Sequence, residues 1–312
     1  MKITVLDADT VGRDLDLSPL SAVGEYEAYP QTPHEMIPER IKDSDIVMIN
    51  KAKMTADVLT GAEKLKLICI AATGYDNIDT AYCREHGIAV CNVAGYSTQS
   101  VAQLTVAMAL SLYNRLEEYT GKVRSGEYSR GNSANILEPV YHEICGKTWG
   151  IIGYGNIGKQ VGKVAEALGC RVIYNRRSAG DGVTLDRLMK DSDRLSGHTP
   201  LNDSTRGLVS REMIGLMKSD AILINVARGA VCDEAALAEA VGNGMIGGIG
   251  VDVYSKEPFP SEHPFAKLAG MPNVILTPHM AWGSYEARVR CLDEIVMNIK
   301  SFCEGGKRNR VV

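Results

Sequence analysis

Three short segments of the chain each end an apolar run on side chains that could do acid–base or anion-binding chemistry. They are INVARG, which contains Arg228, IGVDVYSKEP, which contains Asp252 and Glu257, and VILTPH, which ends on His279. An arginine can hold a substrate carboxylate, and a histidine can transfer a proton near neutral pH. A carboxylate beside that histidine fixes its tautomer and favours its charged form. These residues predict proton transfer on a substrate that carries a carboxylate.

The hexapeptide GYGNIG matches the dinucleotide-binding pattern G-x-G-x-x-G, with an apolar run (TWGII) before it and a helical pattern (KQVGKVAEAL) after it. Gly153 would permit the tight turn, Gly155 would let the backbone approach a pyrophosphate, and Gly158 would let helix and strand pack closely. The helix start, with Asn156 and Ile157, would offer N–H groups and a positive dipole end to the anion. The alternative is a tight strand-to-helix turn with no ligand.

The strand after this helix, RVIYN, ends on Asn175 and is followed by Arg176 and Arg177. A protein that binds NAD usually has an acidic residue here, which contacts the ribose hydroxyls. The missing carboxylate and the two guanidinium groups favour the 2′-phosphate of NADP, with NAD as the other possible cofactor. A solvated basic turn is the alternative interpretation.

Each catalytic candidate alone has an ordinary interpretation, since a single histidine is usually a surface or core residue and glutamate before proline often opens a turn. Their order after a dinucleotide-binding turn is what favours an active site. In a doubly wound sheet, the carboxyl ends of the strands meet at one crevice, so these side chains are expected to gather there. No metal is expected in the site, because the six histidines are scattered along the chain.

The elements that must position these residues are strands and helices in alternation. Short apolar runs alternate with helical patterns along all 312 residues, which predicts an α/β protein with two domains. One long helix is expected over 97–126, and an amphipathic helix is expected over 285–305. The segment DSDRLSGHTPL should contain a buried strand, but Arg194 and Gly197 interrupt its apolar pattern.

Composition excludes several classes of protein. The net charge is −4 and basic residues do not cluster, which argues against a nucleic-acid or anionic-membrane surface. The sequence contains neither an apolar stretch of about 18 residues nor the apolar core of a signal peptide. The eight cysteines include no C-x-x-C pair, so we expect reduced thiols and a cytoplasmic location.

The segments ATGYDNID, NVAGYSTQSVAQLTVAMAL, GKTWGIIGYGNIG, HTPLNDSTRGL, MKSDAILINVARG, VDVYSKEP and ILTPHMAW together resemble the D-2-hydroxyacid dehydrogenase family. The resemblance extends over essentially the whole chain. Within the family, GYSTQSVAQ and TPHMAWGSYEAR are most similar to the hydroxypyruvate reductase, or glycerate dehydrogenase, branch.

The resemblance implies a role for each candidate. Arg228 would bind the substrate carboxylate and polarise its carbonyl, His279 would donate the proton, and Glu257 would pair with His279 and favour its charged form. Thr73 and Gly74 would hold the substrate carboxylate with backbone N–H groups. The further contacts it implies are Asp252 and Ala227 at the nicotinamide amide, Thr199, Pro200 and Thr205 along the cofactor, and Lys51 near the substrate, although Lys51 could equally be a surface lysine.

The resemblance also implies two doubly wound parallel-sheet (Rossmann-like) domains, with the active site in the cleft between them. Residues 1–97 and 284–312 would form a flavodoxin-like substrate domain, and residues 98–283 would form the dinucleotide-binding domain. The apolar segment STQSVAQLTVAMAL would contribute to a homodimer.

The expected reaction is direct hydride transfer between a nicotinamide cofactor and a small 2-oxo acid, with hydroxypyruvate or glyoxylate first. A larger aliphatic 2-oxo acid is an alternative substrate. A regulatory protein that senses nicotinamide cofactors without catalysis is an alternative of another class, and it would need a partner-binding tail or insertion. Another type of dehydrogenase is less favoured, because the glycine turn begins as late as Gly153 and Glu257 is present.

Overall fold

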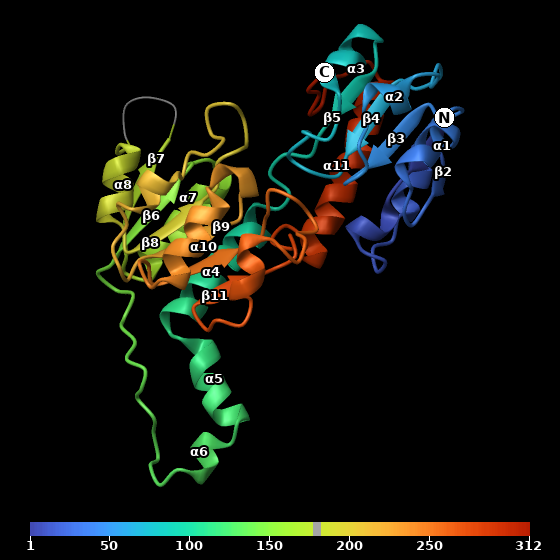
Figure 1. The fold of residues 1–312 in the computed structure, drawn as a ribbon. Helices are drawn as coiled ribbons and strands as arrows, with labels where there is room; N and C mark the ends of the chain where they lie inside the picture. Colours follow the sequence, from blue (N-terminus) through green and yellow to red (C-terminus); the bar gives the residue numbers. More distant parts are fainter. Residues whose placement is uncertain (177–181) are drawn as a thin grey trace. The chain divides into compact units, whose positions relative to one another are not determined.

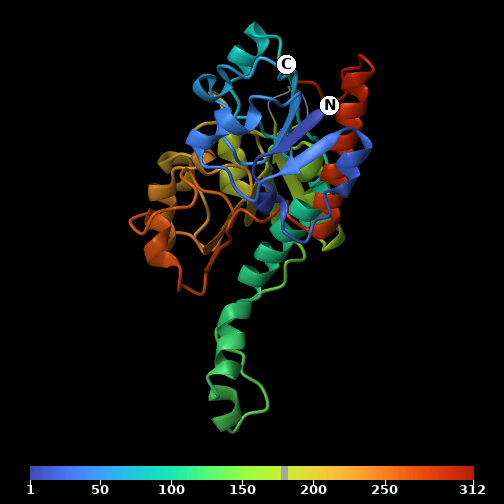
Figure 2. The same cartoon turned by 90° about the vertical axis from the view of Figure 1, so that its right-hand side faces the viewer.

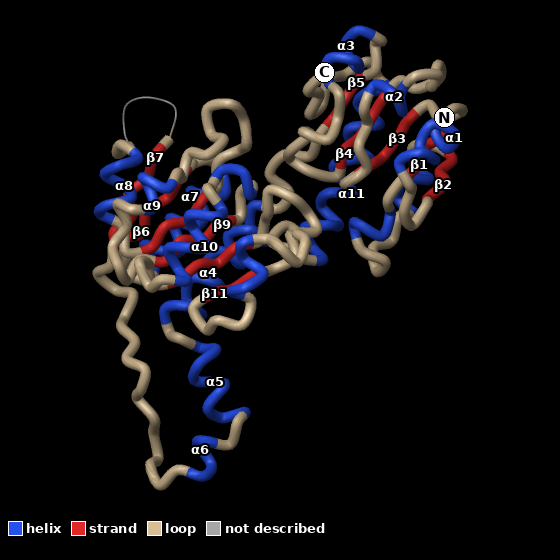
Figure 3. The backbone as a smooth tube through the Cα atoms, viewed as in Figure 1, coloured by secondary structure: helices blue, strands red, loops and turns tan. Residues whose placement is uncertain are grey.

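The computed structural model describes residues 1–176 and 182–312. The chain forms two compact units, Met1–Ser97 with Gly283–Val312 and Thr98–Trp282. Each unit is built around one parallel β-sheet, with helices between successive strands (Figures 1 and 3). Within the described ranges, every helix is too short or too polar to cross a membrane.

The first unit has a five-stranded sheet in the order β2-β1-β3-β4-β5, with all pairs parallel. This is the flavodoxin-like order, and its topological switch point lies between β1 and β3. The strands are β1 (Lys2–Val5), β2 (Glu25–Ala28), β3 (Ile46–Ile49), β4 (Leu67–Ile70) and β5 (Ala89–Cys91), and the helices are α1 (Ile37–Ile41), α2 (Ala56–Leu59), α3 (Thr80–Glu85) and α11 (Tyr285–Cys303). The apolar strands β3 and β4 are wholly buried.

The second unit has a six-stranded parallel sheet in the order β11-β10-β9-β8-β6-β7. The strands are β6 (Thr148–Ile152), β7 (Arg171–Asn175), β8 (Arg194–Gly197), β9 (Ile222–Asn225), β10 (Gly248–Val251) and β11 (Val274–Leu276). The helices are α4 (Thr98–Tyr113), α5 (Leu116–Arg124), α6 (Glu127–Arg130), α7 (Asn156–Ala167), α8 (Leu185–Asp191), α9 (Arg211–Ile214) and α10 (Glu234–Gly242), with 3-10 turns η4 (Gly229–Val231) and η5 (Pro264–Leu268).

Apolar side chains fill both faces of this second sheet. Helices α4 and α7 pack on one face with Trp149, Ile151 and Ile224. Helices α8, α9 and α10 cover the other face, where Leu195 and Leu223 point. The arrangement is doubly wound, and such a sheet binds ligands outside the carboxyl ends of its strands.

Strand β8 forms in spite of Arg194, which we expected to interrupt it. Arg194 is 1% exposed, and its guanidinium lies over the ring of Tyr113 at 3.7 Å from the centroid. It donates hydrogen bonds to the backbone oxygens of Asp193 and of Asp220, the latter at 3.3 Å. Burial lowers the pKa of Arg194. An aromatic face and two carbonyls therefore take the place of the apolar neighbours that a buried strand usually has.

The prediction of a single helix over 97–126 is wrong, because the structure has two helices there. The break follows α4 at Arg115, whose φ of 53° is left-handed, and α5 begins at the next residue. The Arg115 guanidinium pairs with Glu118 at 2.6 Å. Beyond the break, α5 and α6 project away from the sheet of their own unit (Figures 1 and 2).

Candidate active site

The glycine turn after β6 has room for a ligand at one glycine and close contacts at the other two. Gly153 has a φ of +89°, and a Cβ there would lie 2.8 Å from the Thr199 nitrogen. A Cβ on Gly158 would lie 2.4 Å from the Gly153 oxygen, so the helix packs directly on the turn. A Cβ on Gly155 would meet no atom of the described residues within 4 Å. The turn fits a dinucleotide phosphate beside Gly155.

Helix α7 begins at Asn156, and its first N–H groups are not used inside the helix. The Lys159 N–H donates to the Gly155 oxygen at 2.9 Å, which closes the first turn. The N–H groups of Asn156, Ile157 and Gly158 precede this bond, so they have no earlier carbonyl within the helix to meet. They and the positive end of the helix dipole are suited to hold a pyrophosphate.

The end of β7 forms the next wall of this site. The Asn175 side-chain amide donates to the Val183 oxygen at 2.8 Å, while the Asn175 oxygen accepts from the Gly153 N–H at 2.9 Å. Asn175 therefore joins the glycine turn to the segment after β7. Arg176 is half-buried, and Arg177 lies outside the described residues.

The loop after β8 is braced from within. The Thr205 hydroxyl donates to the Pro200 oxygen at 2.6 Å and accepts from the Asn202 N–H at 2.8 Å. His198, next to Thr199, lies behind the glycine turn, and its N–H donates to the Ile152 oxygen at 2.8 Å. Burial lowers the pKa of His198 to about 3, so its ring is neutral at physiological pH.

Three neighbouring strands, β9, β10 and β11, bring the candidate catalytic segments to one edge of the sheet. The Asp252 N–H donates to the Asn225 oxygen at 3.0 Å, and the Thr277 N–H donates to the Val251 oxygen at 2.9 Å. The His279 N–H donates to the Asp252 oxygen at 2.8 Å. The polar residues that follow these strands are therefore neighbours, as parallel strands of equal direction require.

His279 and Glu257 form a close pair. The distance from His279 Nδ1 to Glu257 Oε2 is 2.6 Å, and the two side chains are 21% and 31% exposed. Glu257 Oε1 also accepts from the Tyr254 N–H at 2.9 Å, which orients the carboxylate. His279 has a φ of 52°, an uncommon conformation for a residue with a side chain. A carboxylate at Nδ1 fixes the orientation of the imidazole ring.

Arg228 follows β9 and lies just before the 3-10 turn η4. The Asn225 side chain donates to the Arg228 oxygen at 3.0 Å and accepts from the Ala227 N–H at 3.1 Å, which shapes this bend. The next residue must be glycine, because a Cβ on Gly229 would lie 2.1 Å from the Ser255 nitrogen. The Arg228 segment thus lies directly against the loop that carries Glu257.

Asp252 uses its carboxylate to hold the segment around His279. One oxygen accepts from the Thr277 hydroxyl at 2.6 Å and from the Met280 N–H at 2.9 Å, and the other accepts from the Ala281 N–H at 2.9 Å. Burial raises the pKa of Asp252 in spite of these bonds. The carboxylate therefore orients the histidine segment, and its contact with a nicotinamide amide stays a prediction.

The first unit holds the other substrate-binding candidates. Thr73 follows β4, and its hydroxyl donates to the Val93 oxygen at 3.0 Å; Gly74 is the next residue. Lys51 follows β3 with an exposed side chain, and its N–H donates to Asp7 at 2.6 Å. Both segments lie at the carboxyl ends of strands in the five-stranded sheet, where α/β proteins bind ligands.

Comparison with known proteins gives this site its context. The sequence profile described as "D-isomer specific 2-hydroxyacid dehydrogenase, NAD binding domain" matches residues 106–281. The chain is 38% identical to a glycerate dehydrogenase of Methylorubrum extorquens, over 99% of this chain and 98% of that protein. It is 35% identical to a hydroxypyruvate reductase of Blautia hydrogenotrophica, over 100% and 99%. The chain belongs to the D-isomer specific 2-hydroxyacid dehydrogenase family.

The solved structures agree with this assignment. The chain superimposes on an acyclic imino acid reductase in complex with NADPH and D-Arg with a TM-score of 0.89, at 30% identity and over 100% of both chains. As a D-2-hydroxyacid dehydrogenase, the protein is a nicotinamide-dependent oxidoreductase with two parallel-sheet α/β domains. Histidine, cysteine and carboxylate side chains of the described ranges do not gather in threes that could hold a metal ion.

Several residues that shape the site of this D-2-hydroxyacid dehydrogenase were missed from the sequence. Asp7 lies after β1, is 6% exposed, and accepts N–H groups from Asn50, Lys51 and Ala52. Its burial raises its pKa. The signal in the sequence is a carboxylate directly after an apolar strand. Its partners lie more than forty positions away, so the sequence could not name them.

Proposed function

We propose that this D-2-hydroxyacid dehydrogenase reduces small 2-oxo acids, with hydroxypyruvate and glyoxylate as its preferred substrates. The observation that carries the proposal is the 2.6 Å pair of His279 and Glu257, on strand ends next to that of Arg228. The names of the relatives, glycerate dehydrogenase and hydroxypyruvate reductase, support the choice of substrate.

The bound nicotinamide cofactor supplies the hydride. His279 donates a proton from Nε2 to the substrate oxygen as the carbonyl becomes an alkoxide, and it accepts that proton in the reverse direction. Glu257 at Nδ1 stabilises the charged imidazolium before the transfer. The Arg228 guanidinium orients the substrate carboxylate and stabilises negative charge that develops on the carbonyl oxygen.

We assign substrate binding to the first unit and dinucleotide binding to the second. Backbone N–H groups at Thr73 and Gly74 bind the substrate carboxylate, and Lys51 adds a positive charge near it. Asp7 supports this assignment for Lys51, because it holds the backbone of the segment in one conformation. Ala227 offers its backbone to the nicotinamide amide, and Thr199 lies along the cofactor.

NADPH is the proposed cofactor. Asn175 replaces the usual acidic residue, and Arg176 and Arg177 follow it with two positive charges. The related imino acid reductase was solved with NADPH.

Replacing Arg177 with Asp is expected to lower the NADPH/NADH ratio of kcat/KM by about 10-fold or more, because one charge-assisted phosphate contact becomes a repulsion. Arg187→Asp, an exposed arginine of α8, is the control, and equal ratios in both variants contradict the phosphate role.

The reaction is tested with purified protein, a panel of 2-oxo acids and both cofactors. His279→Ala is expected to lower kcat by about 100-fold or more, with little change in cofactor affinity, because proton transfer is lost. Arg228→Ala is expected to raise KM and lower kcat together. His142→Ala, an exposed histidine in the same unit, is the matched control.

Two experimental results would favour a different function. Oxidation of NADPH only when an amine accompanies the 2-oxo acid would favour imine reduction, as in the related imino acid reductase. Cofactor binding without turnover on any substrate would favour a regulatory protein that senses the nicotinamide cofactor.

We also propose that the protein is a homodimer. The segment that follows the apolar helix α4, residues 116–141, exposes large apolar side chains, which mark interaction surfaces. They are Leu116, Val123, Tyr128, Leu137, Val140 and Tyr141. Light scattering is expected to give twice the chain mass, and Val123→Asp with Leu137→Asp is expected to give monomers. A monomeric wild type contradicts the proposal.

A cytoplasmic location is proposed from the thiols. All eight cysteines lie in the described part of the chain as free thiols, and six of them are buried. Free thiols persist in reducing compartments. Detection of the native protein outside the cytoplasm would contradict this.

A further inference from the structure

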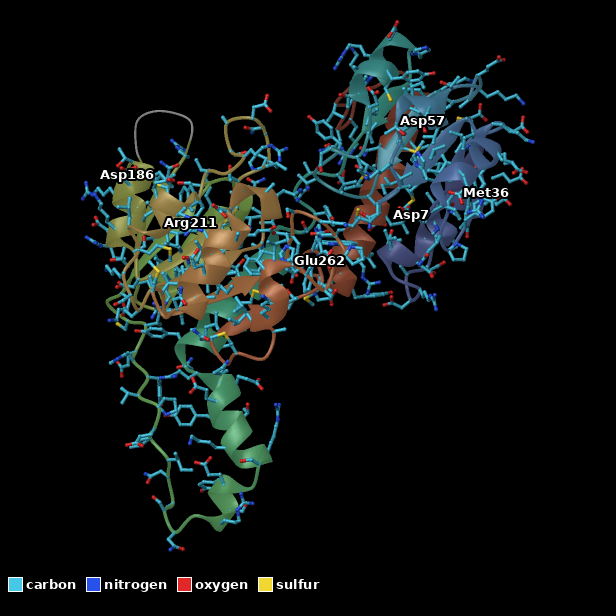
Figure 4. The ribbon with its side chains drawn as sticks, in the orientation of Figure 1. Asp7, Met36, Asp57, Asp186, Arg211 and Glu262 are labelled. Carbon is cyan, nitrogen blue, oxygen red and sulfur yellow. The ribbon has the colours of Figure 1, made fainter. Side chains whose placement is uncertain are left out.

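Residues 252–263 form the loop that brings Glu257 to His279. The loop joins β10 to η5, and Glu262 near its end is labelled in Figure 4. All of its residues are described, and they lie outside helices and strands. Side chains of neighbouring elements must therefore hold the loop in position.

One carboxylate, that of Glu234 in the first turn of α10, binds this loop at two points. Its Oε1 accepts from the Ser255 N–H at 2.9 Å, and its Oε2 accepts from the Ser255 hydroxyl. Oε2 also lies 3.2 Å from His263 Nε2. The side chains of Glu234 and His263 are 11% and 6% exposed. Hydrogen bonds to a shielded carboxylate are strong, so this group ties two distant points of the loop together.

His263 is held in one tautomer and one orientation. Its Nδ1 accepts from the Phe265 N–H at 3.3 Å, so Nε2 carries the proton of the neutral ring and donates to Glu234. The ring centroid lies 5.1 Å from that of Phe259, 5.2 Å from that of Phe265 and 5.9 Å from that of Tyr254. The imidazole is thus a rigid support for the carboxylate.

The connection from Glu234 to Glu257 is very short. The Tyr254 N–H donates to Glu257 at 2.9 Å, and the next N–H along the chain, that of Ser255, donates to Glu234 at 2.9 Å. These two N–H groups belong to planar peptides that share the Tyr254 Cα. A shift of Ser255 therefore changes the direction of the Tyr254 N–H and the position of the Glu257 carboxylate.

We propose that Glu234 and His263 are a pair of positioning residues. They hold Ser255 so that Glu257 meets His279 at hydrogen-bond distance. The pair acts through the loop and does not touch the substrate. This inference rests on the proposed function for its effect on catalysis, but its effect on the loop can be measured without turnover.

The kinetic test compares Glu234→Ala with Glu239→Ala. Glu239 lies on the same helix, 52% exposed, in an ion pair of 2.8 Å with Arg211, which is labelled in Figure 4. Glu234→Ala is expected to lower kcat by about 10-fold or more while the cofactor Kd is unchanged, because the proton donor loses its oriented partner. Glu239→Ala is expected to keep the wild-type kcat. Glu234→Gln, which retains an acceptor for the Ser255 N–H, is expected to recover part of the loss.

A double-mutant cycle separates positioning from a general loss of stability. Glu257→Gln is expected to lower kcat, because His279 loses its carboxylate partner. Adding Glu234→Ala to Glu257→Gln should lower kcat little further, because Glu234 acts through Glu257. A Glu234→Ala enzyme with the wild-type kcat overturns the proposal.

Amide hydrogen exchange tests the same link in protein that need not turn over. The Tyr254 and Ser255 amides are expected to exchange about 10-fold faster or more in Glu234→Ala, and at the wild-type rate in Glu239→Ala. Should Glu234→Ala fail to fold, Glu234→Gln and Ser255→Ala are measured in its place. An unchanged Tyr254 amide overturns the inference. A wild type without turnover rejects the proposed function alone, since the exchange result still decides the positioning role.

Discussion

The histidine behind the glycine turn makes the stability of the second unit depend on pH. His198 has both ring nitrogens buried, with no hydrogen-bond partner in the described part of the chain. Its pKa falls from 6.5 to about 3 because burial disfavours the charged ring. Above pH 6.5 the ring is neutral in the folded and unfolded chains. Below that pH the unfolded chain binds a proton that the folded chain rejects, so stability falls from pH 6.5 towards pH 3.

The size of this effect follows from the shift. At pH 5 the pKa of His198 in the unfolded chain is about 1.5 units above the solution pH. This difference corresponds to a loss of about 2 kcal/mol in the free energy of unfolding, at 1.36 kcal/mol per unit. His198 as a whole residue is half-buried, so partial solvation reduces this upper value to about 1–2 kcal/mol. For a unit of this size the expected change in Tm is about 2–8 °C.

The assay is scanning calorimetry of the cofactor-free protein at pH 7.5 and pH 5.0. Wild type is compared with His198→Asn, which cannot titrate, and with His142→Asn, the exposed control. The substitution of His198 changes the packing equally at both pH values, so only the difference between them is used. Wild type and His142→Asn should lose about 2–8 °C more than His198→Asn on acidification. Equal losses in all three proteins would refute the reasoning.

Other predictions concern tight or buried contacts of the second unit. Gly229→Ala places a Cβ 2.1 Å from a backbone nitrogen of the neighbouring loop, so kcat/KM should fall sharply and stability by about 1–3 kcal/mol; a crystal structure with an unmoved loop would contradict this. Asp252→Asn turns an amide N–H towards a backbone donor, and urea unfolding should show a loss of about 1–3 kcal/mol. Arg194→Met should leave the free energy of unfolding unchanged or raise it, because it removes a buried charge. Tyr113→Ala should lower the free energy of unfolding by about 3 kcal/mol or more. A larger loss in Arg194→Met than in Tyr113→Ala would disprove this account of the buried cation.

The sequence alone determined the α/β class, the dinucleotide turn and the order of the strand ends. These features depend on short-range properties, because buried parallel strands need apolar runs and only glycine fits the two tight positions, Gly153 and Gly158. Asp233 is the N-cap of helix α10, and its side chain accepts from the Ala236 N–H at 2.9 Å. A cap is a contact over three residues, so local sequence is sufficient to show it.

Elements with weak local patterns needed the tertiary structure. Strand β2 has the sequence EYEA and an exposed surface, and it exists because its backbone pairs with β1. Strand β8 contains a buried arginine that Tyr113, some eighty positions earlier, makes tolerable. The break at Arg115 interrupts a helical pattern that continues through it. For β2 and β8, a partner remote in the sequence outweighs the local preference.

The candidate site also contains residues that the sequence predicts and residues that only the tertiary structure identifies. Arg228, Glu257 and His279 could be chosen from the sequence because each ends or follows an apolar strand. The supports around them, among them Asp7, Glu234 and His263, carry no local signal beyond a polar residue near a strand or helix end. The roles of Asp7 and Glu234 come from hydrogen bonds to backbone groups 21 to 45 residues away, and His263 meets the Glu234 side chain 29 residues away. Only the folded chain decides which amide meets which carboxylate, because that choice depends on how loops pack in space.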